Sequence, residues 1–244
     1  MNSRDADRLG ASILDAVRGG DPAGGLALLA PHLARRTPFR LLDRIGARIG
    51  AGPRKDTGAF LDRLAEGRAM GAWPLIGTAL AAQLERDPAG ALRRCRSYIV
   101  LAGVWYAADT LAERVPGAAL TGNFHRALAV LKRWRPDRDR WVRKSCGVAV
   151  HLWAKRAHGD PRQLPKVKML LAFLAPLFGE DDLDAVKGIG WGLKTLGRYY
   201  PDALAPWLVR RIGTARSFRP LMLRKAATYL PSKARNDAYQ AMYR

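Results

Sequence analysis

Apolar residues recur at three- and four-residue spacing along almost the whole chain, and no stretch alternates convincingly between apolar and polar positions. The first spacing places apolar side chains on one face of a helix, whereas a half-buried strand needs alternation. Clusters rich in Pro, Gly and Asp interrupt the pattern, so that each piece between them is about one helix long. These clusters are DPAGG (21–25), RTPF (36–39), GPRKD (52–56), RDPAG (86–90), VPG (115–117), RPDRD (135–139), HGDPRQLP (158–165), FGEDD (178–182) and SFRP (217–220). The pattern predicts an all-α fold.

Three of the later helical pieces resemble one another. KSCGV (144–148), KGIGW (187–191) and KAATY (225–229) each place an apolar or aromatic residue four positions after a Lys, and the lysines are spaced by 43 and 38 residues. A period near 40 residues with two helices per period is typical of HEAT-like repeats, which stack into a solenoid. We therefore expect a single HEAT-like α-solenoid domain over residues 1–244, with a concave, basic face. On that face Lys144, Lys187 and Lys225 would form one track. The alternative is that each Lys is a solvated charge near the start of its own helix.

The stretch VWYAADTLAERV (104–115) contains a candidate functional site. It is predicted to be helical, with Val104, Leu111 and Val115 on its apolar stripe. Trp105 and Asp109 lie four residues apart, so they share a face at the border of that stripe. A mid-helix carboxylate beside a large aromatic residue is a candidate site, although an Asp in this position is most often a solvated surface residue.

The charge of the chain narrows the class of partner. There are 42 Lys and Arg residues against 21 Asp and Glu, a net charge of +21, and the excess is +6 in residues 1–100 but +15 in residues 101–244. Such a field favours a polyanion, and nucleic acid is the first choice. An Arg-rich composition bias is the alternative, but it does not explain the asymmetry. The charged start of the chain has no signal peptide pattern and no stretch is long enough to span a membrane, so we expect a cytoplasmic, nucleoid-associated bacterial protein with no membrane partner.

Other chemistry finds little support. GIGWGLKTLG (188–197) lacks the third glycine of a dinucleotide loop and follows no strand, so it is predicted to be a helix with small residues for close packing. The four histidines have no metal-ligand spacing, and the two cysteines, Cys95 and Cys146, are expected to be reduced and buried. No cofactor is expected. Four tryptophans are expected to lie in the core: Trp134, Trp141, Trp153 and Trp207.

Three stretches resemble the AlkD-like DNA alkylation repair glycosylases, a family built of HEAT-like repeats. Residues 104–115 are similar to the family's W-W-D-x-V-D segment, with Trp105 on its second Trp and Asp109 on its final Asp. RWRPDRDRWVRKSCGVAV (133–150) is similar to its W-x-x-S-x-N-x-W-x-x-R segment, and DAVKGIGWGLKTLGR (184–198) is similar to its x-x-K-A-I-G-W-x-L-R-E segment, with Trp191 on the Trp. The resemblance is strongest over residues 95–230.

The chain departs from the family pattern at three positions. Val104 and Tyr106 replace a Trp and an Asp, and Lys144 replaces an Arg. Lys keeps the charge that binds a phosphate but loses the bidentate fork. These changes put the range of substrates in doubt more than the chemistry.

The resemblance implies a monomeric DNA glycosylase that excises positively charged N3- or N7-alkylated purines from duplex DNA, in base excision repair. Asp109 would be the catalytic carboxylate, which stabilises the positive sugar of the transition state and holds the attacking water. Trp105 and Trp191 would stabilise cationic groups with their ring faces. Phosphates would be bound by Lys144, Lys187 and Lys225, with help from Arg143, Lys194 and Arg224.

Two other functions remain open at this point. A non-enzymatic HEAT-repeat binder of branched or distorted DNA would need the basic face but not Asp109. A protein-binding HEAT scaffold would explain the fold but not the charge of the second half. The sequence also leaves open whether the lesion is a small methyl adduct or a bulky one.

Overall fold

The computed structural model describes residues 1–243, and these residues form helices with no strand among them. The predicted all-α fold is confirmed. Contacts divide the chain into two compact units, Met1–Val115 and Pro116–Arg244, which we call unit 1 and unit 2. The expectation of one single domain over residues 1–244 stays a prediction.

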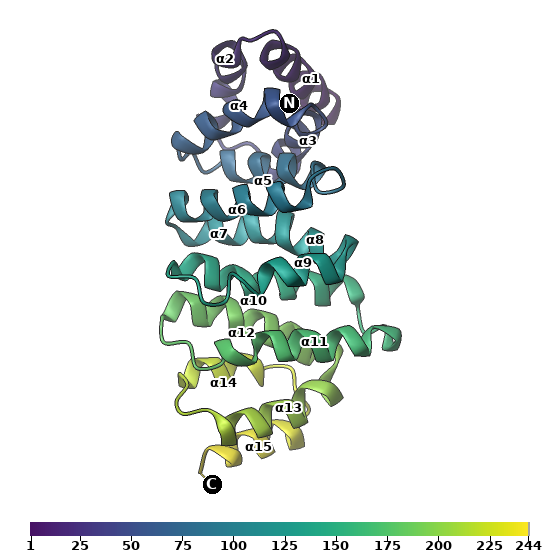
Figure 1. Ribbon diagram of the computed structural model, residues 1–244, viewed down its shortest axis with the longest axis vertical. Coiled ribbons are helices and arrows are strands. Elements are labelled where there is room, and N and C mark those ends of the chain that lie inside the picture. The colour runs from purple at the N-terminus through teal and green to yellow at the C-terminus, as the bar shows by residue number, and fades with distance from the viewer. Residues whose placement is uncertain (244) are drawn as a thin grey trace. The chain divides into compact units, whose positions relative to one another are not determined.

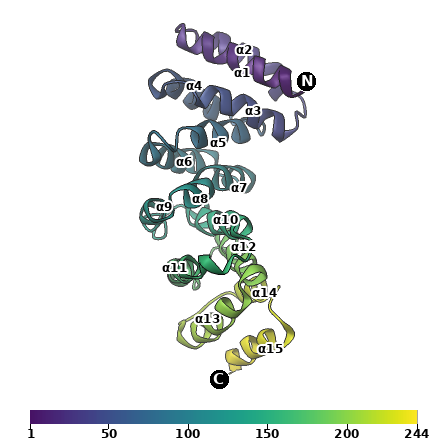
Figure 2. The same cartoon turned by 90° about the vertical axis from the view of Figure 1, so that its right-hand side faces the viewer.

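Unit 1 consists of helices in two layers. Helices α1, α3, α5 and α7 pack against one another in succession, and α4 and α6 lie on one side of this stack (Figure 1, Figure 2). The helices are α1 (Ser3–Arg18), α2 (Pro22–Leu33), α3 (Phe39–Gly50), α4 (Arg54–Glu66), α5 (Ala72–Ala82), α6 (Pro88–Ala102) and α7 (Trp105–Ala112). Since each helix of one layer contacts the next, the core of this unit runs between the layers.

Unit 2 follows the same plan. Helices α10, α12 and α14 form one layer, and α9, α11 and α13 lie on the other side (Figure 2). After a π-helical turn (Glu113–Gly117) the α-helices are α8 (Ala118–Gly122), α9 (Phe124–Leu131), α10 (Arg140–Ala157), α11 (Leu164–Leu174), α12 (Leu183–Tyr199), α13 (Pro201–Thr214), α14 (Pro220–Ala226) and α15 (Ser232–Gln240). Short 3-10 turns cover Pro161–Gln163, Ala175–Leu177 and Ala241–Tyr243. The layer of α10, α12 and α14 carries all six predicted DNA-binding residues.

The starts of α10 and α12 explain why two of the three similar stretches match. Asp139 accepts hydrogen bonds from the backbone N–H groups of residues 141 and 142, and Asp182 does the same for residues 184 and 185. A carboxylate in this position satisfies N–H groups that have no partner inside the helix. Because the two caps are placed alike, Lys144 and Lys187 occupy equivalent positions in the second turn of their helices.

Glycines bring neighbouring helices of each stack close together. In unit 2, a Cβ atom added to Gly147 would lie 2.3 Å from the carbonyl oxygen of Gly188, so α10 and α12 cross with their backbones almost in contact. In unit 1, a Cβ on Gly46 of α3 would lie 2.3 Å from the carbonyl oxygen of Leu75 in α5. The prediction that residues 188–197 form a helix with small residues for close packing is confirmed, since they lie in α12.

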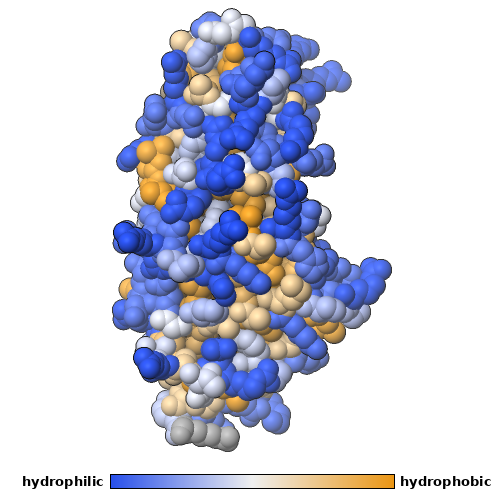
Figure 3. Space-filling view, viewed as in Figure 1, coloured by the Kyte–Doolittle hydropathy of each residue, from blue (hydrophilic) through white to orange (hydrophobic). Residues whose placement is uncertain are grey.

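The surface of unit 2 is not uniform. On the side that Figure 3 shows, apolar atoms gather over α9 and α11, where Met169 and Ala172 are exposed. Within residues 1–243, none of the helices combines the length and the apolar character that crossing a membrane requires.

Candidate functional site

A sharp reversal of the chain presents the start of α7. Gly103 ends α6 in the left-handed conformation, with φ of +60°, and Val104 follows with an extended backbone. Glycine adopts the left-handed conformation without strain. The helix therefore begins at Trp105, and the expectation that Val104 belongs to it is wrong. The next helical positions, Ala107, Ala108 and Leu111, are completely buried against α5 and α6.

Trp105 and Asp109 occupy the border between this buried face and the surface. The Trp105 side chain is 59 % exposed, which is unusual for a large aromatic residue, and its ring meets Tyr106 edge-on at 5.8 Å. Asp109, one turn further, is half-buried, and its Oδ1 atom is shielded from solvent. The predicted edge position of both residues is confirmed. A partly buried carboxylate beside an exposed ring is suited to stabilising a cation.

An ion pair fixes the far end of α7. The Arg114 guanidinium, just beyond the helix, donates from two nitrogens to the Asp43 carboxylate of α3 at 2.7 and 3.0 Å. Thr78 of α5 donates to the same carboxylate at 2.8 Å. These bonds tie α3, α5 and the end of α7 together, which limits how far α7 can move. No local pattern in the sequence indicates this pair, because its partners are 71 residues apart.

The layer of α10, α12 and α14 in unit 2 gathers a cluster of positive charges. Burial lowers the pKa of Lys225, and so do the charges of neighbouring cations. These are Lys194, Lys144, Lys187 and Arg224. Together with Lys225 they form the lysine cluster. The structure thus brings together five of the six residues predicted to bind DNA.

Members of the lysine cluster differ in their access to solvent. Lys187 is exposed and lies 3.0 Å from the Asp184 carboxylate of its own helix, whereas Lys225 is half-buried with its stem against Gly190. Lys144 is only 5 % exposed, because its stem lies against Gly188 and its Nζ is 5.9 Å from the centre of the Trp141 ring. Three lysines with the same place in the sequence repeat therefore have unequal access to a ligand.

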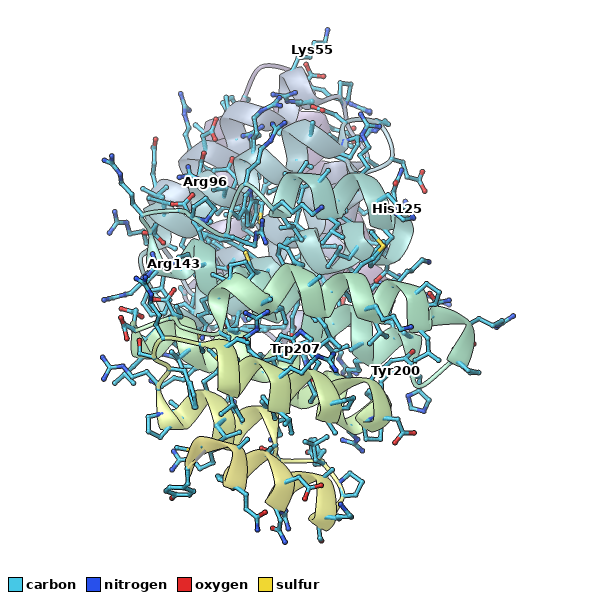
Figure 4. All side chains as sticks on the ribbon, turned by 60° about the horizontal axis from the view of Figure 1, so that its bottom comes forward. Lys55, Arg96, His125, Arg143, Tyr200 and Trp207 are labelled. Atoms are coloured by element: carbon cyan, nitrogen blue, oxygen red, sulfur yellow. The ribbon has the colours of Figure 1, made fainter. Side chains whose placement is uncertain are left out.

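Arg143 does not join the lysine cluster. It lies near the start of α10 (Figure 4), where its guanidinium donates to both oxygens of the Glu180 carboxylate, at 2.6 and 3.0 Å. It also donates to the backbone oxygens of Asp137 and Arg138. Burial alone would raise the pKa of Glu180, but the hydrogen bonds from the Arg143 guanidinium hold it below its usual value. These bonds favour a structural role for Arg143.

Trp191 is stacked on a histidine that the sequence analysis did not single out. The rings of Trp191 and His151 are 4.0 Å apart between centres and inclined by 27°. Burial lowers the pKa of His151 to about 4, and the positive charge of Lys155 adds to the shift. The imidazole is therefore neutral near pH 7. His151 lies seven residues after Lys144, on the same face of α10, and that spacing is the signal by which it can be found.

A hydroxyl group fixes the orientation of this imidazole. Thr195 donates its proton to the carbonyl oxygen of Trp191 at 3.0 Å, and its Oγ1 atom lies 2.7 Å from Nδ1 of His151. The hydroxyl and Nδ1 therefore share one hydrogen bond, and the tautomer of the imidazole decides which of the two donates. One face of the Trp191 ring is thus covered by a neutral ring held in place by Thr195.

The remaining tryptophans and both cysteines lie in the interior. The prediction that four tryptophans are core residues is confirmed, since all are at most 9 % exposed: Trp134, Trp141, Trp153 and Trp207. Trp207 lies between α11 and α13 (Figure 4). Cys95 and Cys146 are buried and unpaired with each other, as expected, and burial raises the pKa of both thiols. In the part of the chain that the structure describes, no group of three or more His, Cys, Asp and Glu side chains is placed to hold a metal ion.

The family model described as "DNA alkylation repair enzyme" matches residues 59–230. The match covers most of the chain, including α7, α10, α12 and α14, so the chain belongs to this family. The resemblance seen in the sequence is confirmed, and the match begins earlier than residue 95. No curated protein and no solved structure matches the chain. Membership of the family gives the chain a role in DNA repair, with DNA as its substrate.

Proposed function

We propose that this chain is a DNA glycosylase that excises positively charged N3- or N7-alkylated purines from duplex DNA. The observation that carries the proposal is the pairing of an exposed Trp105 ring with the half-buried Asp109 one turn further along α7. Alkylation makes the ring of such a purine cationic and a good leaving group, so that positive charge grows on the sugar as the bond breaks. A carboxylate next to that sugar stabilises the charge and orients the attacking water.

The roles of the other residues follow from their surroundings. Trp105 in unit 1 and Trp191 in unit 2 each offer a ring face to a cation. The lysine cluster binds phosphates without reading sequence, because lysine side chains at the backbone carry no base information. Arg143 is left out of the phosphate contacts, since its guanidinium is bound to Glu180.

The proposal extends to the architecture. The helix pairs of each unit are HEAT-like repeats, and the face formed by α10, α12 and α14 is turned toward the DNA. One support is the pair of Asp139 and Asp182 caps, which lie 43 residues apart. Another is that the stems of Lys144 and Lys225 pack on successive glycines of α12. Stacked repeats align equivalent positions into a continuous ligand surface.

The test is release of free base from duplex DNA that contains N7-methylguanine, at enzyme excess and at matched DNA occupancy. Asp109→Asn removes the charge and hardly changes the volume, so folding and DNA affinity should survive while the excision rate falls about a hundredfold or more. The matched control is Asp15→Asn, which removes one exposed carboxylate from α1 of the same unit and should leave the rate unchanged. Equal rates for wild type and Asp109→Asn would remove Asp109 from the mechanism.

A second outcome separates the proposal from a non-enzymatic DNA binder. Trp105→Ala and Trp191→Ala should slow the excision of cationic bases more than that of neutral ones, because a cation–π interaction needs a cation. If the wild type releases no base from any alkylated duplex yet binds it tightly, the chain binds damaged or distorted DNA without cutting the glycosidic bond.

A further inference from the structure

The same layer of unit 2 also carries a row of aromatic rings and cations, which begins at Lys194 of the lysine cluster. Its members are Lys194, Tyr229, Arg198, Tyr199 and His158, which we call the ring–cation row. The Lys194 Nζ is 5.0 Å from the centre of the Tyr229 ring, and the Arg198 guanidinium is 5.3 Å from the same ring. Arg198 also lies 5.6 Å from the Tyr199 ring, and Tyr199 lies 4.9 Å from the ring of His158.

Three structural elements bring the row together. Lys194, Arg198 and Tyr199 come from the last turns of α12, and Arg198 lies on the helix stripe that begins at Lys187. Tyr229 comes from the turn that follows α14, and His158 ends α10 in the left-handed conformation, with φ of +49°. The row is therefore not a local sequence motif, because its members are up to 71 positions apart.

The cations of the row keep their charge for an external ligand. Within residues 1–243, neither Lys194 nor Arg198 forms a salt bridge, whereas Arg143, Arg162 and Arg219 of the same unit lie within reach of carboxylates. A ring face attracts a cation without neutralising it. Arg198 is bracketed by two tyrosine rings, so its position is restricted while its donors stay free of acidic partners.

The rings of the row are open to solvent. Tyr229 is 45 % exposed, His158 and Arg198 are exposed, and Tyr199 is half-buried. Duplex phosphates accept hydrogen bonds from cationic, hydroxyl, amide and backbone N–H groups, and binding them does not need an exposed ring face. Exposed rings interleaved with cations are instead the means by which proteins bind unpaired nucleotides, whose bases stack on the rings while the phosphates meet the cations.

We infer that the ring–cation row binds unpaired nucleotides that adjoin the duplex held by the lysine cluster. The protein then prefers duplex DNA that ends in, or is interrupted by, a short single strand. This inference goes beyond the proposed base excision, because it concerns the form of DNA that is bound and does not require Asp109. It therefore stands or fails independently of the excision test.

The experiment measures the affinity of the full chain for three labelled DNA probes by fluorescence anisotropy at physiological salt. The first probe is a blunt 20-base-pair duplex, the second carries a four-thymidine overhang, and the third carries an overhang of four abasic nucleotides with the same phosphates. Wild type should bind the thymidine overhang at least about fivefold more tightly than the blunt duplex, the low end of what stacking of one base contributes. The abasic overhang should lose most of this gain.

Substitutions then assign the effect to the row. Tyr229→Ala should abolish the preference for the thymidine overhang, and Tyr229→Phe should keep it, because the ring is retained. The matched control is Arg224→Ala, which removes a cation of the lysine cluster and should weaken binding to all three probes alike. Thermal unfolding followed by circular dichroism checks that each variant is folded.

Two results would overturn the inference. Equal binding of blunt and thymidine-tailed duplexes by the wild type would mean that the row does not bind bases. If Tyr229→Ala weakens all three probes equally, the ring only holds Lys194 and Arg198 in position for duplex phosphates.

Discussion

In unit 1, the guanidinium groups of Arg94 and Arg114 form ion pairs with carboxylates of neighbouring helices. In unit 2, the guanidinium of Arg198 instead contacts two tyrosine rings. The first arrangement joins helices: Arg94 of α6 meets Asp62 of α4, and Arg114 meets Asp43 of α3. The second arrangement holds a cation at the surface without neutralising it. Arg94 and Arg114 thus join helices, whereas Arg198 keeps a surface charge that we propose is used to bind a ligand.

The difference also gives the charge asymmetry of the chain a structural meaning. A carboxylate within hydrogen-bonding distance cancels the field of an Arg, so paired cations contribute little to attracting DNA. Cations that contact rings or other cations keep their field, as in the lysine cluster, where like charges help to lower the pKa of Lys225. Five of the cations behind the excess of +15 in residues 101–244 lie in this cluster.

The largest expected effect tests the feature that the two units share, the close crossing of stacked helices. Gly147→Ala and Gly46→Ala should each destabilise their own unit by about 3 kcal/mol, because the new methyl group would meet backbone that cannot move aside. Hydrogen exchange followed by mass spectrometry reports on each unit separately. Gly213→Ala, which meets nothing within 4 Å, is the control in unit 2. Unchanged protection in both glycine variants would contradict the close crossing.

A pair of arginine variants should show opposite effects in the two units. Arg114→Ala leaves Asp43 without its guanidinium and should lower the free energy of unfolding by about 2 kcal/mol, with little change in DNA affinity. Arg198→Ala should change stability by less than about 0.5 kcal/mol but weaken DNA binding and flatten its salt dependence by about one unit. Urea unfolding and salt titrations check both. The comparison fails if Arg114→Ala weakens DNA binding as much as Arg198→Ala does.

A smaller effect concerns the histidine behind Trp191. The pKa of His151 is lowered to about 4 from an ordinary value of 6.5. Between these two pH values the imidazole is therefore protonated in the unfolded chain but neutral in the folded chain. Stability should therefore fall as the pH drops from 6.5 to 4, by on the order of 1–2 kcal/mol once solvent screening is allowed for. His151→Phe keeps a stacking ring and should remove this part of the pH dependence, as measured by urea unfolding at pH 7 and 4.5.

His32 of unit 1 provides the matched control for this pH effect. Burial, followed by the charge of Arg35, lowers its pKa as well, but among the residues that the structure describes no ring stacks on it as Trp191 does on His151. His32→Phe should change the pH dependence less than His151→Phe does. If the two variants behave alike, the burial of His151 against Trp191 does not contribute specifically to the pH dependence of the stability of unit 2.

Sequence periodicity was sufficient for the helices and for the edge position of two candidate site residues, Trp105 and Asp109. Helix boundaries depend on nearby residues, such as the Asp139 and Asp182 caps, so local patterns predict them. The positions of Trp105 and Asp109 at the edge of α7 followed from a four-residue spacing in the same way. The resemblance to the family rested on these local stretches, which is why it was visible in the sequence and was confirmed.

Contacts between helices could not be predicted from the sequence. Arg143 and Lys144 are adjacent in the chain, yet Arg143 is bound to Glu180 and the stem of Lys144 packs against Gly188 of α12. Arg198 meets Tyr229, and His151 meets Trp191, only because three helices stack at spacings that no local pattern encodes. A repeat in the sequence places equivalent residues on equivalent helix faces. Whether each side chain there is free, buried or paired depends on what the neighbouring helix presents, and only the tertiary structure determines that.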